Sequence, residues 1–304
     1  MALLFAACGA DDDAADDSVT STTAPDDVAQ TAEAEESDSD DGEATGVDAV
    51  PDEEPEVVEQ AADLPIVLVH GAWQDGTAWA RVQQVLEDGG RRVSAVSLPG
   101  RDGTDAGAQT LVGYRDVVIS EIEKYDGPVI LVGHSFGGMT ISGVAEAIPA
   151  DVAHLVYLAA YLPADGDSLA GLADADQGSL LSEEGNLLLE GEPLLATVPT
   201  ELFAGIFCPD CDPADPDLVT ASAVAEPAGP LLETVTLTEA NFGSIAKTYI
   251  QTALDVVIGP DLQSAMAAEA GITDPIVIQA GHAPYISAAD DVADLIGQLA
   301  ANPS

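Results

Sequence analysis

Basic residues are scarce in this chain. Only 7 of its 304 residues are Lys or Arg, against 55 Asp and Glu, so the formal net charge is −48. Residues 1–63 contain 21 of the acids and no base, and residues 64–304 contain the other 34 acids and all seven bases, a net charge of −27. A field of this sign repels polyanions, which excludes nucleic acid and anionic membrane surfaces as default partners. So strong an excess of carboxylates over residues 64–304 also suggests, as a hypothesis, adaptation to high salt.

Long apolar runs are absent as well. No run reaches the roughly 18 residues that a membrane-spanning helix needs. The short apolar segment at residues 1–9 ends in Ala-Ala-Cys-Gly and resembles part of the lipobox of bacterial lipoproteins, in which Cys8 would carry the lipid. The alternative is an apolar segment without a targeting role. A lipid on Cys8 would be the only expected link to a membrane, and it predicts an extracytoplasmic location, secreted or anchored.

Residues 10–63 have no Leu, Ile, Met or aromatic residue. They consist mostly of Asp, Glu, Ala, Ser and Thr, a composition that cannot bury enough apolar surface to fold. We expect an acidic, disordered tether that precedes one folded domain at residues 64–304.

Cysteine is rare too: besides Cys8 the chain has only Cys208 and Cys211. In an oxidising compartment two cysteines so close together favour a local disulfide that closes a loop. A zinc site would need two further ligands, and no second Cys pair or His pair exists. A redox role or free thiols are the alternatives.

From Leu64 onward, short apolar segments alternate with helical patterns. The expected strands lie at Pro65–Val69, Val93–Leu98, Val129–Val132, His154–Ala160, Lys247–Thr252 and Pro275–Ala280, and the helices between them at Thr77–Glu87, Leu111–Tyr125 and Met139–Ala147. Strands and helices in alternation predict an α/β fold with a doubly wound, mostly parallel, six-stranded sheet.

The alternation stops between about residues 162 and 243. This stretch is rich in Leu, Pro and Ala, with helical patterns at Ser179–Leu189 and Thr200–Phe207. We expect an inserted cap that folds over the strand ends, and its apolar side chains would line a small-molecule pocket or simply form the core of the cap.

The stretch Gly133-His134-Ser135-Phe136-Gly137 matches G-x-S-x-G between a buried strand and a helix. Glycines on both sides permit a sharp strand-to-helix turn that exposes the serine hydroxyl at a helix N-terminus. The alternative is a glycine-rich turn with a capping serine. The context favours Ser135 as a nucleophile.

A serine nucleophile needs a base and an acid. Of the four histidines, only His282 follows the last strand and precedes the last helix, where loops of such a sheet converge, so it is the predicted base. Asp255 lies at the tip of the fifth strand and is the predicted acid, with Asp261 as the alternative.

Charge that develops on a substrate carbonyl needs backbone donors. The amides of Phe136, after the nucleophile, and Ala72, in the loop after the first strand, are the candidates. Gly71 and Trp73 flank Ala72 and are expected at the substrate pocket. No metal or cofactor is implied.

Four motifs together resemble the α/β-hydrolase superfamily, and within it the branch of methylesterases, hydroxynitrile lyases and salicylate-ester esterases. They are Val-His-Gly-Ala-Trp at 69–73, Gly-His-Ser-Phe-Gly-Gly-Met at 133–139, Tyr-Ile-Gln-Thr at 249–252 followed by Asp255 and Gln263, and Gly-His-Ala-Pro-Tyr at 281–285. The resemblance implies Ser135, Asp255 and His282 as the catalytic triad. It also implies that a lyase would carry Thr at position 71 and Lys at 283, where this chain has Gly71 and Ala283.

The sequence thus predicts a serine hydrolase that cleaves a small-molecule carboxylic ester through an acyl-enzyme. An amidase or lactonase would use the same residues, and a tethered binding protein without catalysis is a third possibility. Oligomeric state is left open.

Overall fold

The computed structural model describes residues 63–303 apart from 102, 213 and 216–223. Cys8 and the predicted tether, except its last residue, lie outside this part of the chain. Within it, no helix combines the length and apolarity that crossing a membrane requires.

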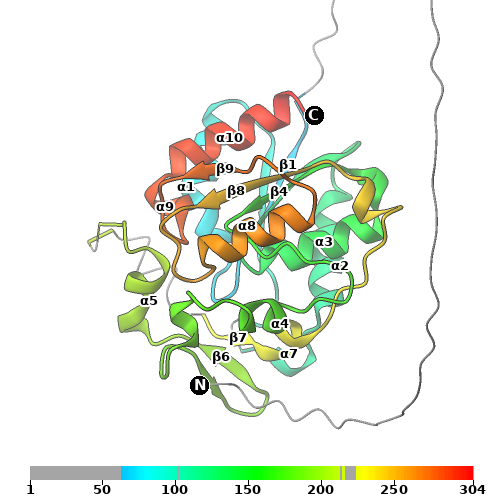
Figure 1. The fold of residues 1–304 in the computed structure, drawn as a ribbon. Helices are drawn as coiled ribbons and strands as arrows, with labels where there is room; N and C mark the ends of the chain where they lie inside the picture. The colour runs from blue at the N-terminus through cyan, green and yellow to red at the C-terminus, as the bar shows by residue number, and fades with distance from the viewer. Residues whose placement is uncertain (1–62, 102, 213, 216–223, 304) are drawn as a thin grey trace, which may run out of the picture. The chain divides into compact units, whose positions relative to one another are not determined.

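Six parallel strands form the main sheet (Figure 1). They are β1 (Ile66–Val69), β2 (Val93–Val96), β3 (Val129–His134), β4 (Val152–Leu158), β8 (Lys247–Thr252) and β9 (Ile276–Ile278), in the order β2-β1-β3-β4-β8-β9. Strand β3 lies inside the sheet with all six residues buried, which explains its unbroken apolar run. The predicted α/β fold is confirmed, with strand ends that differ by up to two residues.

Helices cover both faces of the sheet. They are α1 (Ala80–Asp88), α2 (Leu111–Ile122), α3 (Gly137–Ala147), α8 (Pro260–Glu269), the short α9 (Pro284–Ser287) and α10 (Ala289–Ala301). Helix α1 contacts α10, and α2 contacts α3. Right-handed crossovers place α1 and α10 on one face and α2, α3 and α8 on the other. The helix expected at Thr77–Glu87 is divided into a 3-10 turn at Gly76–Trp79, capped by the Asp75 side chain, and α1.

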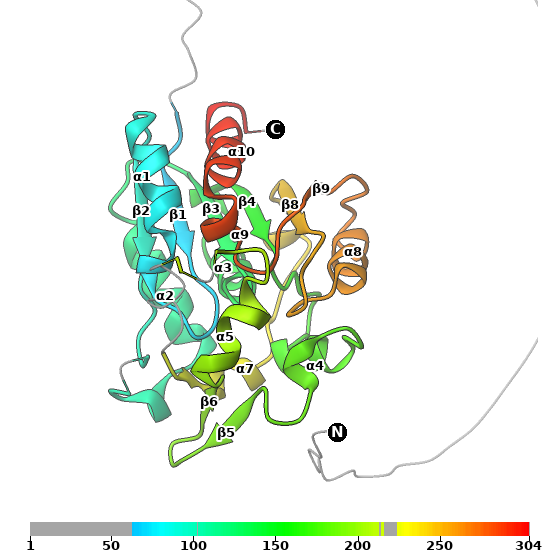
Figure 2. The ribbon, with the colours of Figure 1, turned by 90° about the vertical axis from the view of Figure 1, so that its left-hand side faces the viewer.

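We call residues 162–243 the cap. Its described elements are α4 (Leu169–Asp174), β5 (Leu188–Glu190), β6 (Leu195–Thr197), α5 (Thr200–Phe207), β7 (Glu226–Pro227) and α7 (Ala228–Leu232). Strands β5, β6 and β7 form a small antiparallel sheet that the sequence did not predict. In Figure 2 these elements gather below the main sheet, at the end opposite α10.

One helix prediction in the cap is confirmed and the other is wrong. Helix α5 spans the expected residues 200–207. The expected helix at 179–189 is instead a 3-10 turn, Leu180–Ser182, followed by strand β5. Gly185 between them adopts φ 90°, a left-handed conformation that ends a helix, and so the leucines that follow it extend into a strand.

Candidate active site

Ser135 stands at the turn from β3 to α3 in the left-handed conformation, with φ 51°. The turn requires both flanking glycines. A Cβ on Gly133 would come within 2.8 Å of the Gly137 backbone, and a Cβ on Gly137 within 2.6 Å of the Val69 carbonyl oxygen. The turn therefore holds Ser135 in a strained backbone conformation, next to the amides at the start of α3, as the sequence predicted.

His282 and Asp255 form a buried pair. The Nδ1 atom of His282 lies 2.8 Å from Oδ2 of Asp255, and both side chains are shielded from solvent. Because the carboxylate accepts, Nδ1 is the donor, and the other ring nitrogen, Nε2, is left as an acceptor. Nε2 is buried and has no hydrogen-bond partner among the described residues. A nitrogen in this state is able to take a proton from a hydroxyl.

Four further hydrogen bonds fix the Asp255 carboxylate. Their donors are Thr252 Oγ1 at 2.9 Å, Val257 N at 2.8 Å, Ile258 N at 3.0 Å and Gln263 Nε2 at 3.0 Å. The alternative acid, Asp261, lies exposed in the first turn of α8. The structure thus brings Asp255 to His282, as expected from its place after β8.

The loop after β1 carries the predicted amide donor of Ala72 and is held by His70. Burial, and secondarily the charge of Arg101, lowers the pKa of His70, so its imidazole is neutral. Its Nε2 accepts from Leu98 N at 3.0 Å, which leaves Nδ1–H to donate to the Gly71 carbonyl oxygen at 2.8 Å. That carbonyl belongs to the same peptide unit as the Ala72 amide. Because the peptide is planar, fixing one end orients the other.

Gly71 lies against the nucleophile. A Cβ at this position would come within 2.7 Å of Ser135 Cβ and 2.9 Å of His134 Nδ1. A side chain larger than hydrogen would therefore displace the loop that carries the Ala72 amide.

Trp73 joins this loop to the cap. Its backbone is left-handed, with φ 60°, and its indole Nε1 donates to Ala196 O on β6 at 3.0 Å. Its ring meets Phe207 edge-on at 5.7 Å, and Phe207 in turn meets the His282 ring at 5.6 Å. Phe207 also stacks on Phe203 at 4.1 Å. These three aromatic side chains form an apolar wall beside His282.

The cap also contacts the loop that carries the acid. Ser179 Oγ donates to Val257 O at 2.8 Å, Leu180 N donates to Val256 O at 2.7 Å, and Gly259 N donates to Asp176 Oδ2 at 2.7 Å. The segment after β8 is thus bonded to the cap over four consecutive residues.

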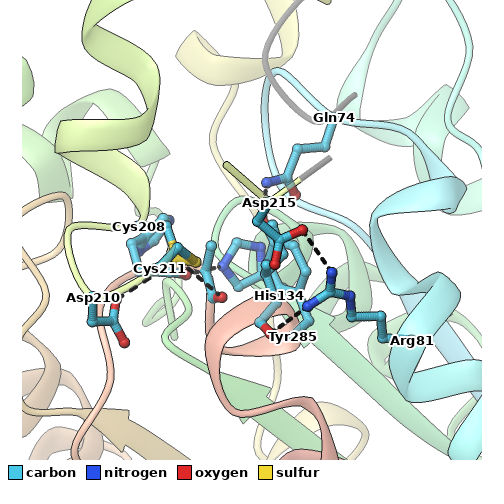
Figure 3. The surroundings of a disulfide bond; sticks show 11 residues. Gln74, Arg81, His134, Cys208, Asp210, Cys211, Asp215 and Tyr285 are labelled. Atoms are coloured by element: carbon cyan, nitrogen blue, oxygen red, sulfur yellow. Dashed lines mark hydrogen bonds and ion pairs between the residues drawn. A yellow bond between two sulfur atoms is a disulfide. The ribbon is translucent and has the colours of Figure 1, made fainter. Parts of the chain in front are cut away.

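Cys208 and Cys211 form a disulfide in the loop after α5, with a Cα–Cα distance of 5.3 Å (Figure 3). The loop packs on the segment that carries the base: a Cβ on Gly281 would come within 2.6 Å of Asp210 Oδ1. Beyond it, Asp215 accepts from Arg81 on α1 at 2.6 Å (Figure 3). The disulfide loop therefore restricts the space around His282.

Three residues with contacts at the site were not recognised as such from the sequence. His134 donates to the His282 carbonyl oxygen, Gln263 donates to Asp255, and Glu226 accepts from the Trp73 amide. The first two lie in the quoted motifs, whereas Glu226 has no local sequence signal. In the described part of the chain, no group of three or more His, Cys, Asp or Glu side chains is arranged to hold a metal ion.

The sequence matches the family model described as the alpha/beta hydrolase family over residues 66–295. It is 29% identical to putative methylesterase 11 of Arabidopsis thaliana, across 77% of this chain and 63% of that protein, so it spans less than two thirds of this relative. It is 32% identical to a pyrethroid hydrolase of Sphingobium wenxiniae, across 79% and 88% of the two chains. A crystal structure of a pyrethroid hydrolase with BIF superposes with a TM-score of 0.70, at 26% identity and over 79% and 98% of the two chains.

Proposed function

Because the chain belongs to the alpha/beta hydrolase family, we propose that it is a serine hydrolase that cleaves a carboxylic ester through an acyl-enzyme. The observation that carries the proposal is the buried pair of His282 Nδ1 and Asp255 Oδ2, 2.8 Å apart, which leaves Nε2 of His282 available as a base. The methylesterases and pyrethroid hydrolase among its relatives are named for ester-hydrolysing activities, which supports the same reaction class.

In the proposed mechanism, Ser135 Oγ attacks the acyl carbonyl carbon while His282 Nε2 takes the hydroxyl proton. Asp255 holds the imidazole and stabilises the cation that forms. The amides of Ala72 and Phe136 bind the oxyanion, and removal of one such donor in a comparable site costs about 3–4 kcal/mol of transition-state stabilisation. When the tetrahedral intermediate collapses, the ester C–O bond breaks and the alcohol leaves with the proton from His282.

The second half of the reaction repeats the first with water. His282 takes a proton from water as the oxygen attacks the acyl-serine carbon. The bond to Ser135 Oγ then breaks, the proton returns to Oγ, and the carboxylic acid is released.

The aromatic wall of Trp73, Phe203 and Phe207 supports an apolar, uncharged small-molecule ester as the substrate. Arg101 is the cation nearest in sequence to the Ala72 loop, and it is paired with Glu226 at 2.8 Å. An anionic acyl group would therefore lack a partner there, and the net negative charge of the chain would oppose its approach.

Hydrolysis of p-nitrophenyl esters of increasing acyl length by the full chain in molar KCl tests the proposal. The wild type is expected to turn over short and medium acyl esters, and Ser135→Ala, Asp255→Asn and His282→Ala to lose at least about 10³-fold in kcat. A fluorophosphonate probe should label the wild type and not Ser135→Ala. Activity that survives in Ser135→Ala contradicts the nucleophile, and activity on amides or lactones alone would change the substrate class.

We also propose an extracytoplasmic location. The disulfide between Cys208 and Cys211 supports it, because such bonds persist in oxidising compartments. Lipidation at Cys8 stays a prediction. Metabolic labelling with an alkyne fatty acid, absent in Cys8→Ser, would support the anchor, and equal labelling of both would contradict it.

A further inference from the structure

Glu226 is a buried acid that the proposed reaction does not use. It lies on cap strand β7 with no exposed surface. Its Oε2 atom is 2.8 Å from Nη2 of Arg101 and accepts from the Trp73 backbone N–H at 3.2 Å. Its Oε1 atom accepts from the Tyr114 hydroxyl at 3.2 Å. One carboxylate thus joins the cap, helix α2 and two loops that follow strands β1 and β2.

Stability alone is a weak explanation for this group. Burial raises the pKa of Glu226, although the charge of Arg101 opposes the shift, so the site disfavours the charge it contains. A buried ion pair can often be replaced by apolar side chains with no loss of stability. The contact with Trp73 is the one that reaches the proposed active site.

Trp73 needs support in its observed conformation. Its φ of 60° is unfavourable for a residue with a Cβ atom. Two cap groups bind it: Glu226 Oε2 takes its backbone N–H, and Ala196 O takes its indole N–H. On the other side of Ala72, His70 Nδ1 binds the Gly71 carbonyl oxygen. Ala72 therefore lies between two peptide units, each fixed by a group outside the loop.

We propose that Glu226 is a positioning residue for the oxyanion site: it holds the Ala72–Trp73 peptide so that the Ala72 amide faces the developing oxyanion. The inference rests on the proposed function. A hydrogen-bond acceptor is what the role requires, and the negative charge serves only to match Arg101. An amide side chain at 226 fits the same partners, because its oxygen would accept from Trp73 and its NH₂ would donate to the Tyr114 hydroxyl.

A matched pair of variants separates the acceptor from the charge. Arg101→Met with Glu226→Leu removes the ion pair and the acceptor together, without leaving a buried charge. Arg101→Met with Glu226→Gln removes the same charges and keeps the acceptor. We expect kcat on a p-nitrophenyl ester to fall about 10- to 100-fold in the Leu variant, with KM within about threefold of wild type. The Gln variant should keep kcat within about threefold of wild type.

Tyr114→Phe is the second control. It removes the hydrogen bond to Oε1 of Glu226 and leaves the bond to Trp73. Its melting temperature should fall while kcat stays within about twofold of wild type. Affinity for a trifluoromethyl ketone, which forms a tetrahedral adduct with the serine, should decrease in parallel with kcat/KM in the Leu variant only.

Amide hydrogen exchange of the peptide that contains residues 71–73 gives a readout that does not need turnover. Exchange should be faster in the Leu variant and unchanged in the Gln variant. Equal kcat and equal exchange in the two variants would overturn the proposal, as would a kcat loss in Tyr114→Phe as large as that in the Leu variant. A wild type without any hydrolytic activity would contradict the proposed function, and the exchange comparison would still decide whether Glu226 holds the loop.

Discussion

His134 Nε2 donates a hydrogen bond to the backbone carbonyl oxygen of His282, at 2.7 Å. Burial, followed by the nearby His282, lowers the pKa of His134, so the ring is neutral and has one N–H to donate. The two rings lie 4.7 Å apart. The residue before the proposed nucleophile therefore fixes the backbone of the proposed base, and the spacing of Ser135 and His282 depends on this bond.

Replacement of His134 by Leu should reduce kcat about tenfold or more, with little change in KM, because the base loses its backbone support. Kinetics on a p-nitrophenyl ester measures it. His154→Gln is the control, since His154 is buried on β4 and bonds to Thr248 Oγ1 at 2.8 Å. It should alter stability and leave kcat unchanged. Equal kcat losses in the two variants would assign His134 a purely structural role.

Acid should destabilise the protein through His70 and His134. Both pKa values lie well below the ordinary value of 6.5. Below pH 6.5 the unfolded chain binds protons that the folded chain does not, so the free energy of unfolding falls as pH falls toward the folded pKa. Each histidine contributes up to about 1.4 kcal/mol per pH unit.

Urea unfolding between pH 7.5 and 5, at constant high salt, measures this dependence. Wild type should lose about 1.4 kcal/mol more per pH unit below pH 6.5 than His134→Leu, which lacks one of the two groups. Parallel curves for the two proteins would contradict the prediction.

Gln263 should matter for activity through Asp255. Its side chain is fully buried, and Nε2 donates to Asp255 Oδ2 at 3.0 Å while Oε1 accepts from Thr252 N at 3.1 Å. Gln263→Leu should lower kcat about tenfold and the free energy of unfolding by about 1–3 kcal/mol. Gln251→Leu is a matched control, because Gln251 bonds to Pro260 O and Ser264 at the same helix and has no hydrogen bond to Asp255 among the described contacts. It should lower stability without the loss in kcat.

High salt should stabilise the folded chain. The seven bases are already engaged in the described part: five form ion pairs with acids, Arg92 lies over the Tyr125 ring, and Lys247 donates to backbone carbonyls. Most carboxylates therefore have no cation near them and repel one another until counterions screen them. The melting temperature should rise by more than about 5 °C from low salt to molar KCl, equal to about 2 kcal/mol. A flat response would remove the hypothesis of adaptation to high salt.

The sheet and the residues proposed for the triad could be predicted because both have local signals. Strand β3 is an unbroken apolar run, and Ser135, Asp255 and His282 each follow a strand at the edge where loops converge. The cap carries weaker signals, since leucines after Gly185 fit a helix or a strand equally well. Glu226 could not be recognised at all: its partners at 73, 101 and 114 lie more than 100 residues away, and only the tertiary fold brings them together.

The bonds between the cap and the loops limit how such enzymes can be recombined. The carbonyl of Ala196 and the carboxylate of Glu226 bind Trp73, and the segment from Asp176 to Leu180 binds the loop that carries Asp255. A cap transplanted from a relative to change the substrate range would arrive without these partners unless it offered acceptors at the same places. In chimeras of this fold, the cap and the loops after β1 and β8 should therefore be exchanged together as one unit.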